Sequence, residues 1–270
     1  MLVDTHCHLN FNTFDEDRDL VVQRAVKSGV DRILNPGIDI KTSQQAIELA
    51  NRFPNVYAAI GIHPNELKSW NESSIEQLRQ MANNPKVVAI GEIGLDYYRN
   101  KSSKELQTIA FKSQLELAAE LDLPIIIHSR NVSQIDQRAM KNLLSILSDW
   151  VKSLKSKNLR IQTRPGVLHS FSSDIEYAES AAQLNFLIGI TGPVTFKNAV
   201  ELREVVSIIR LDSLLIETDS PFLTPHPFRG KRNEPANVRF IAEEISNIKK
   251  LPFEQVVQKT GKNAKRLFNW

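Results

Sequence analysis

The stretch PIIIHS, residues 124–129, decides the fold because it joins an apolar run to a polar end. Three isoleucines follow one another with no alternation of apolar and polar residues, which is typical of a parallel strand covered on both faces. His128 comes directly after them. The same unit, an apolar run that ends in a polar residue, recurs along the chain.

Seven further apolar runs lie at residues 1–6, 32–38, 56–63, 87–94, 166–171, 186–192 and 214–219. The segments between them repeat apolar residues with the period of a helix, as in residues 42–53 and 104–122. Eight strand–helix units in roughly 250 residues predict an α/β fold, a closed (β/α)8 TIM barrel rather than an open doubly wound sheet. Two more helices are predicted after the eighth run, over residues 237–250 and 253–268.

Length and composition fit one domain over residues 1–270, because no linker interrupts the pattern and 41% hydrophobic residues can fill one large core. The single cysteine excludes an internal disulfide framework. No apolar run resembles a signal peptide or a membrane span. We therefore expect a cytoplasmic monomer with no membrane partner and no obligate protein partner.

The positive charge is unevenly distributed. The formal net charge is +3, but residues 229–270 hold ten Lys or Arg against four Glu, a local charge of +6. The long segment 131–165, predicted to be an amphipathic helix with a basic loop, carries seven Lys or Arg and two Asp. Both regions suit a polyanionic partner such as DNA, and both are also compatible with ordinary solvated surfaces.

Ligand-type residues mark the ends of six of the eight runs. They are His6 and His8, His63, Glu92, His128, His169 and Asp219. The active site of a barrel lies at these strand ends, and histidines scattered for packing would not respect strand polarity. Residues i and i+2 of an extended segment face the same side, so His6 and His8 can address one ion while Cys7 points away.

The donor set favours a metal centre. Imidazoles with carboxylates suit zinc, manganese, iron or cobalt, and carboxylates also admit magnesium. Four histidines with Glu92 and Asp219 exceed what one tetrahedral ion needs, so we predict two divalent ions (Mg²⁺, Mn²⁺ or Zn²⁺) bridged by Glu92. Such ions would supply hydroxide near neutral pH, with Asp219 as the general base. Each residue alone also fits a buried hydrogen-bonding role; the combination favours the metal.

A phosphodiester substrate requires further positive groups. The stretch FRGKRNEP supplies Arg229, Lys231 and Arg232 after the eighth run, and His63 and Arg130 are further candidates for binding phosphate. Structural ion pairs with barrel carboxylates are the alternative for these arginines. Tyr97 and Tyr98 are able to stack on a base or to pack structurally.

Seven separated motifs span almost the whole chain: DTHCHLN, GIHP, GEIGLDYY, IIIHSR, GVLHSFS, GITGPVTFKNA and ETDSPFLTPHPFRGKRNEP. Together they closely resemble the TatD family of metal-dependent hydrolases. The resemblance implies a barrel of the amidohydrolase type and deoxyribonuclease activity, expected as 3'–5' exonuclease action on single-stranded DNA. It also implies two ions, one held by His6, His8, Glu92 and Asp219, and the other by Glu92, His128 and His169.

The sequence departs from the family pattern away from these ligands. Ser170 and Ser173 stand where the family more often has Cys and Gly, Asn131 stands where an acidic residue is common, and segment 131–165 is longer than usual. These departures concern the fit of the substrate. Two other functions stay open: a metal-dependent ester or amide hydrolase such as a D-aminoacyl-tRNA deacylase, and a noncatalytic scaffold that binds nucleic acid.

Overall fold

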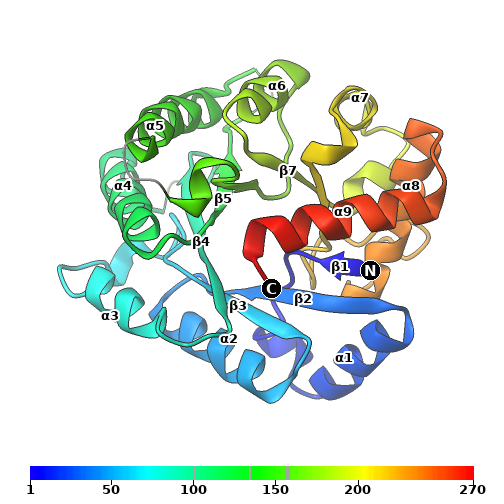
Figure 1. Ribbon diagram of the computed structural model, residues 1–270, viewed down its shortest axis with the longest axis horizontal. Helices are drawn as coiled ribbons and strands as arrows, with labels where there is room; N and C mark the ends of the chain where they lie inside the picture. Colours follow the sequence, from blue (N-terminus) through cyan, green and yellow to red (C-terminus); the bar gives the residue numbers. More distant parts are fainter. Residues whose placement is uncertain (100, 134, 156–158) are drawn as a thin grey trace.

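Eight parallel strands, in sequence order, form the centre of the computed structural model, which describes residues 1–99, 101–133, 135–155 and 159–270 (Figure 1). They are β1 (Leu2–Asp4), β2 (Val30–Pro36), β3 (Val56–Ile60), β4 (Val87–Asp96), β5 (Ile125–Arg130), β6 (Gly166–Leu168), β7 (Leu187–Ile190) and β8 (Leu214–Ile216). Hydrogen bonds from Thr5 N–H to the Ile216 carbonyl (3.2 Å) and from His8 N–H to the Ser220 carbonyl (2.8 Å) join the first strand to the last. The predicted (β/α)8 barrel is confirmed.

Helices surround the strands. They are α1 (Arg18–Lys27), α2 (Ile40–Arg52), α3 (Ser74–Met81), α4 (Lys104–Leu121), α5 (Arg138–Leu154), α6 (Ile175–Gln183), α7 (Val200–Ile208), α8 (Val238–Lys249) and α9 (Phe253–Phe268). Short 3-10 turns lie at η1 (Asn12–Phe14), η2 (Leu67–Ser69), η3 (Arg160–Gln162), η4 (Gly192–Thr195), η5 (Leu211–Ser213) and η6 (Pro235–Asn237). Segment 131–165 contains α5 and η3, and its positions 134 and 156–158 lie outside the described residues.

Local signals fix where several helices begin. The Asp39 side chain accepts a hydrogen bond from Thr42 N–H at the start of α2, and the Ser103 side chain accepts one from Leu106 N–H at the start of α4. Each side chain thereby satisfies a backbone donor that the helix itself leaves unpaired. No helix in the part of the chain that the structure describes is long and apolar enough to cross a membrane.

Alternation along the strands separates two apolar layers. On β5, Ile125 and Ile127 belong to the cluster between strands and helices, whereas Ile126 belongs to the cluster inside the barrel. Leu267 and Phe268 of α9 join this inner cluster, and Figure 1 shows α9 crossing one end of the barrel. This end is therefore closed by apolar packing, and the polar residues that follow the inner layer gather at the opposite, carboxyl-terminal end.

Candidate active site

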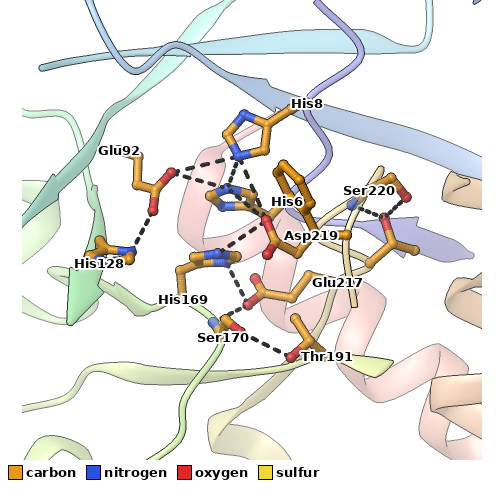
Figure 2. Close-up of polar contacts among 12 residues, drawn as sticks. His6, His8, Glu92, His128, His169, Ser170, Thr191, Glu217, Asp219 and Ser220 are labelled. Atoms are coloured by element: carbon orange, nitrogen blue, oxygen red, sulfur yellow. Dashed lines mark hydrogen bonds and ion pairs between the residues drawn. The ribbon is translucent and has the colours of Figure 1, made fainter. Parts of the chain in front are cut away.

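The carboxyl ends of the strands surround a cavity of about 760 Å³. Five of the six predicted metal ligands line it: His8, Glu92, His128, His169 and Asp219. The sixth, His6, lies beneath them with no exposed surface. We call these six residues, with His63 and Glu217, the histidine–carboxylate cluster. Figure 2 shows all of them except His63.

Four donor atoms meet on one side of the cluster. The Nε2 atoms of His6 and His8 lie 3.2 Å apart, and they lie 3.5 and 3.7 Å from Glu92 Oε2. Asp219 Oδ1 lies 3.8 and 3.6 Å from the same two nitrogens. Ligands bound to one tetrahedral ion at about 2.1 Å lie about 3.4 Å from one another, and His6, His8 and Glu92 form a group with the spacing of a metal site. Asp219 Oδ1 lies close to both imidazoles, so we expect it to be the fourth ligand.

The other oxygen of Glu92 faces a second group of nitrogens. Glu92 Oε1 lies 2.9 Å from His128 Nδ1 and 3.6 Å from His63 Nε2, and Figure 2 shows Glu92 between His128 and the pair His6 and His8. One carboxylate therefore addresses two separate sets of imidazoles, which is the arrangement that a bridging ligand needs. The three residues Glu92, His128 and His63 also form a group with the spacing of a metal site.

His169 is oriented by a carboxylate that the sequence interpretation missed. Its Nδ1 atom lies 2.9 Å from Glu217 Oε1, while its Nε2 atom lies 3.5 Å from Asp219 Oδ1. Glu217 is completely buried and also accepts a hydrogen bond from Ser170 N–H at 2.6 Å. Donation of the Nδ1 proton to Glu217 leaves the Nε2 lone pair free for a cation, as metal-binding histidines require. His169 is directed towards Glu217 and Asp219, and the described groups with metal-site spacing pair it with His6 rather than with His128.

The electrostatics of the cluster suit cations. Burial lowers the pKa of His8 to about 4 and that of His63 to about 3, so both rings are neutral at pH 7. Neutral His8 is able to donate a lone pair to a cation. Burial opposes ionisation of Glu92 and Asp219, but the surrounding histidines outweigh it and hold the pKa of both carboxyl groups below the usual range. Neutral His8 beside these ionised carboxylates is suited to bind a divalent metal ion. Burial disfavours the charged ring of His169, but Glu217 and Asp219 outweigh it and raise the pKa of His169 well above the usual value.

Asp96 was also absent from the sequence interpretation. Its Oδ2 atom lies 3.2 Å from His128 Nε2 and accepts a hydrogen bond from Asn65 Nδ2 at 2.8 Å. Burial disfavours the charged ring of His128, but hydrogen bonds to Asp96 and Glu92 outweigh it and raise the His128 pKa to about 9. His128 therefore lies between two carboxylates.

His63 is fixed in one orientation. Its Nδ1 atom accepts a hydrogen bond from Asn65 N–H at 3.0 Å. A neutral ring that accepts at Nδ1 carries its proton on Nε2, and this nitrogen faces the cavity beside Glu92. The predicted role of His63 as a hydrogen-bond donor to substrate agrees with this tautomer.

The predicted phosphate-binding residues divide into two sets. His63 and Arg130 line the cavity, together with Arg99 and Lys101, which the sequence interpretation did not select. Arg130 lies over the ring of Tyr98 at 4.2 Å, and Lys101 pairs with Glu66 at 3.6 Å. Tyr98 is more than half exposed, whereas the Tyr97 side chain is buried and its hydroxyl accepts a hydrogen bond from Asn142.

The three basic residues of FRGKRNEP, in contrast, are absent from the lining of this cavity. Arg232 donates to both carboxylate oxygens of Asp17, at 2.8 and 2.7 Å, and to the Thr13 carbonyl. Arg229 lies over the ring of Phe196, and Lys231 lies 5.8 Å from the ring of Phe228. Arg232 therefore makes a structural ion pair with a carboxylate, which was the alternative to phosphate binding.

Two of the three residues that depart from the family pattern, Asn131 and Ser173, contact each other. Asn131 Nδ2 donates to Ser173 Oγ at 3.2 Å, and Asn131 Oδ1 accepts from Met140 N–H near the start of α5. Ser170 Oγ lies 3.1 Å from Thr191 Oγ1 at the edge of the cavity. Cys7, as predicted, is fully buried in the apolar core.

Known proteins with a similar sequence or structure extend these observations. The family model described as TatD related DNase matches residues 3–269. The metal-dependent hydrolase YabD of Bacillus subtilis is 43% identical over 268 residues, with 99% of each chain covered. A protein of Salmonella typhimurium named 3'-5' ssDNA/RNA exonuclease TatD is 37% identical over 273 residues, covering 99% of this chain and 98% of its own.

A solved structure agrees with these matches. The crystal structure of YJJV, a TatD homologue from Escherichia coli, superposes with a TM-score of 0.89 at 33% identity, and the match covers 100% of this chain and 98% of that one. The barrel, the histidine–carboxylate cluster and the full-length matches all lead to the same conclusion. The chain belongs to the TatD related DNase family of metal-dependent hydrolases.

Proposed function

We propose that the protein is a metal-dependent 3'–5' exonuclease that hydrolyses phosphodiester bonds of single-stranded nucleic acid, DNA above all. The observation that carries the proposal is the position of Glu92, whose two oxygens face two sets of imidazoles at the base of an open cavity. Two ions held on either side of Glu92 would be suited to stabilise both the attacking and the leaving oxygen of a displacement. The relatives named as exonucleases support the choice of substrate.

The residues of the cluster and of the cavity wall have separate roles in hydrolysis. When bound, the ions supply hydroxide near neutral pH and offset the negative charge of the phosphodiester. Asp219, at the edge of the cavity, accepts the remaining proton as general base. His63 donates from Nε2 to a phosphate oxygen. Arg130 and Arg99, on the wall formed by the ends of β4 and β5, bind phosphates on either side of the scissile bond.

A metal titration tests the bridging role of Glu92. Protein stripped of metal should bind two Mn²⁺ or Zn²⁺ ions per chain in a calorimetric titration, and Glu92→Gln should lose affinity for both. Saturation at one ion, together with full activity of Glu92→Gln, would show that Glu92 does not bridge two metals.

A product ladder tests the reaction. Metal-loaded protein incubated with 5'-labelled single-stranded DNA should release mononucleotides and leave a ladder that shortens from the 3' end, and a chelator should stop it. Fragments of middle length at the earliest times would indicate endonuclease action. If no DNA is cleaved while an amino acid is released from charged transfer RNA, the site is a deacylase, and the nuclease proposal is wrong.

A further inference from the structure

Two phenylalanines stand at the mouth of the cavity and have no part in the reaction described above. Phe11 follows β1 and stacks on the ligand candidate His8, with ring centroids 4.5 Å apart and an angle of 14° between the rings. Phe222 follows β8 and meets Phe11 edge to face at 6.1 Å. Although Phe222 borders the cavity, 51% of its surface is exposed to solvent.

The backbone of Phe222 is held in place. Its N–H donates to the Asp219 carbonyl at 2.8 Å, and its own carbonyl accepts from Asn233 Nδ2 at 2.7 Å. Asn233 is completely buried and also donates to the Thr218 carbonyl. A large apolar ring is thus kept in contact with water by a fixed turn, three residues from a ligand candidate.

The loop of Phe11 is tied to the loop of Phe222. Arg232 donates to the Thr13 carbonyl and to Asp17, both close to Phe11 in the chain, and it also bonds Glu234 at 3.2 Å. The two loops that carry the rings are therefore held to each other without a ligand. Surfaces organised in advance bind more tightly because less freedom is lost on binding.

The two walls of the cavity differ in chemistry. Phe11 and Phe222 form an aromatic wall at the ends of β1 and β8, whereas Arg99, Lys101 and Arg130 form a cationic wall at the ends of β4 and β5. The histidine–carboxylate cluster lies between them. A nucleic-acid strand presents the same pair of chemistries, because each nucleotide has a flat ring on one side and an anionic phosphate on the other.

We infer that Phe11 and Phe222 form a base-stacking subsite, which takes the base of one nucleotide next to the scissile bond. The inference rests on the proposed function and adds to it a contact with the base. A base that stacks on Phe222 has to leave its partner in a duplex, so the subsite favours single strands. Stacking on a phenyl ring is tolerant of base identity because every base has a flat face.

Substrates that lack one base test the inference. A series of single-stranded oligonucleotides carries an abasic residue at the first, second or third position from the 3' end. For the wild-type enzyme, the abasic residue at one of these positions should raise KM about tenfold, the size expected for loss of one stacked base. The effect on kcat should be small.

Variants identify the ring responsible. Phe222→Ala should raise KM about tenfold on the intact oligonucleotide and should abolish the difference between intact and abasic substrates, and Phe222→Trp should restore both. Phe228→Ala is the matched control, since Phe228 is 37% exposed, packs against Phe240 and lies outside the cavity lining. It should behave as wild type. Melting temperatures of all variants should agree within a few degrees.

The outcomes separate the subsite from the proposed function. If the wild-type enzyme cleaves DNA but Phe222→Ala keeps the full difference between intact and abasic substrates, the subsite is wrong and the nuclease stands. If Phe222→Ala lowers kcat equally on every substrate, the ring only shapes the metal site, and the inference is also wrong. If the wild-type enzyme cleaves none of the oligonucleotides, the nuclease proposal itself has failed.

Discussion

The Glu217 carboxylate is completely buried, and it is fitted closely to its surroundings. It accepts hydrogen bonds from Ser170 N–H and the Thr5 hydroxyl besides its contact with His169. A Cβ atom on Gly189 of the neighbouring strand would lie 2.2 Å from Glu217 Oε1, so only glycine leaves room for this carboxylate. Glu217 thereby determines which nitrogen of His169 is free for a metal.

Glu217→Gln should lower metal affinity 10- to 100-fold, the usual cost of removing a partner that orients a ligand histidine. The variant keeps the shape of the side chain but loses the charge that holds the Nδ1 proton of His169. Calorimetric titration with Zn²⁺ measures the change. Glu66→Gln is the control, because Glu66 lines the same cavity and pairs with Lys101. Equal Zn²⁺ affinity in Glu217→Gln and Glu66→Gln would show that Glu217 does not orient a metal ligand.

Cys7 and His8 are adjacent in sequence but should respond oppositely to truncation. Cys7→Ala should cost about 1–2 kcal/mol of unfolding free energy, as for a small core truncation, and should leave metal content unchanged. His8→Ala should lose metal. Metal analysis and urea unfolding of the two variants provide the measurement. Loss of metal from Cys7→Ala would show that Cys7 is a metal ligand and that the prediction is wrong.

At the scale of elements, the loop after β8 is anchored to the start of α1. Arg232 binds Asp17, and Arg24 of α1 binds both Asp17 and Glu234. The hydrogen bond from Arg232 is the main cause that lowers the pKa of Asp17 to about 2. Four alternating charges therefore connect the two loops that carry Phe11 and Phe222.

Arg232→Ala should lower the unfolding free energy by about 1 kcal/mol, since the pair is partly exposed and screened. Because the pKa of folded Asp17 lies below its usual 3.8, this loss should be complete above about pH 4 and should shrink as the pH falls towards 2. Urea unfolding at several pH values measures it, with Lys231→Ala as control. If stability is unchanged and the salt dependence of DNA binding becomes flatter by about one phosphate contact, Arg232 binds phosphate instead.

The sequence predicts the barrel well and the contacts of its loops poorly. Apolar runs report which strands are buried, so all eight strands and the segment with α5 are predicted near their observed positions. The partner of Arg232 could not be predicted, because Asp17 lies 215 residues away in the chain. Glu217 was missed although it stands two residues before Asp219, since an acidic residue near a strand end does not reveal which imidazole it faces.

At the scale of the whole molecule, the barrel gathers ionisable groups in its interior, where burial of charge is unfavourable in free energy. The Glu92 and Glu217 carboxylates and the His6 ring are almost or completely inaccessible to water. Buried charges without compensating partners destabilise a fold, and a ligand that binds only the folded state stabilises it. The cluster should therefore couple metal binding to the stability of the entire barrel.

Addition of Zn²⁺ or Mn²⁺ at about 100 times its dissociation constant should stabilise the metal-free protein by about 2.7 kcal/mol per site. For a chain of this size, that corresponds to a rise in melting temperature of several degrees. Differential scanning calorimetry with and without chelator measures it. Glu92→Gln should show a much smaller rise, and an equal rise in that variant would place the stabilising ion elsewhere.

The junction of β1 with β8 also has a consequence for synthesis of the protein. His6 and Asp219 belong to one cluster, so the ribosome has to add more than two hundred residues between them, about 10–40 s at ordinary elongation rates. Until then β1 keeps one edge unpaired, which favours early contact with chaperones. Until then the nascent chain cannot assemble the histidine–carboxylate cluster, so the proposed nuclease activity cannot act on the messenger RNA that encodes the protein.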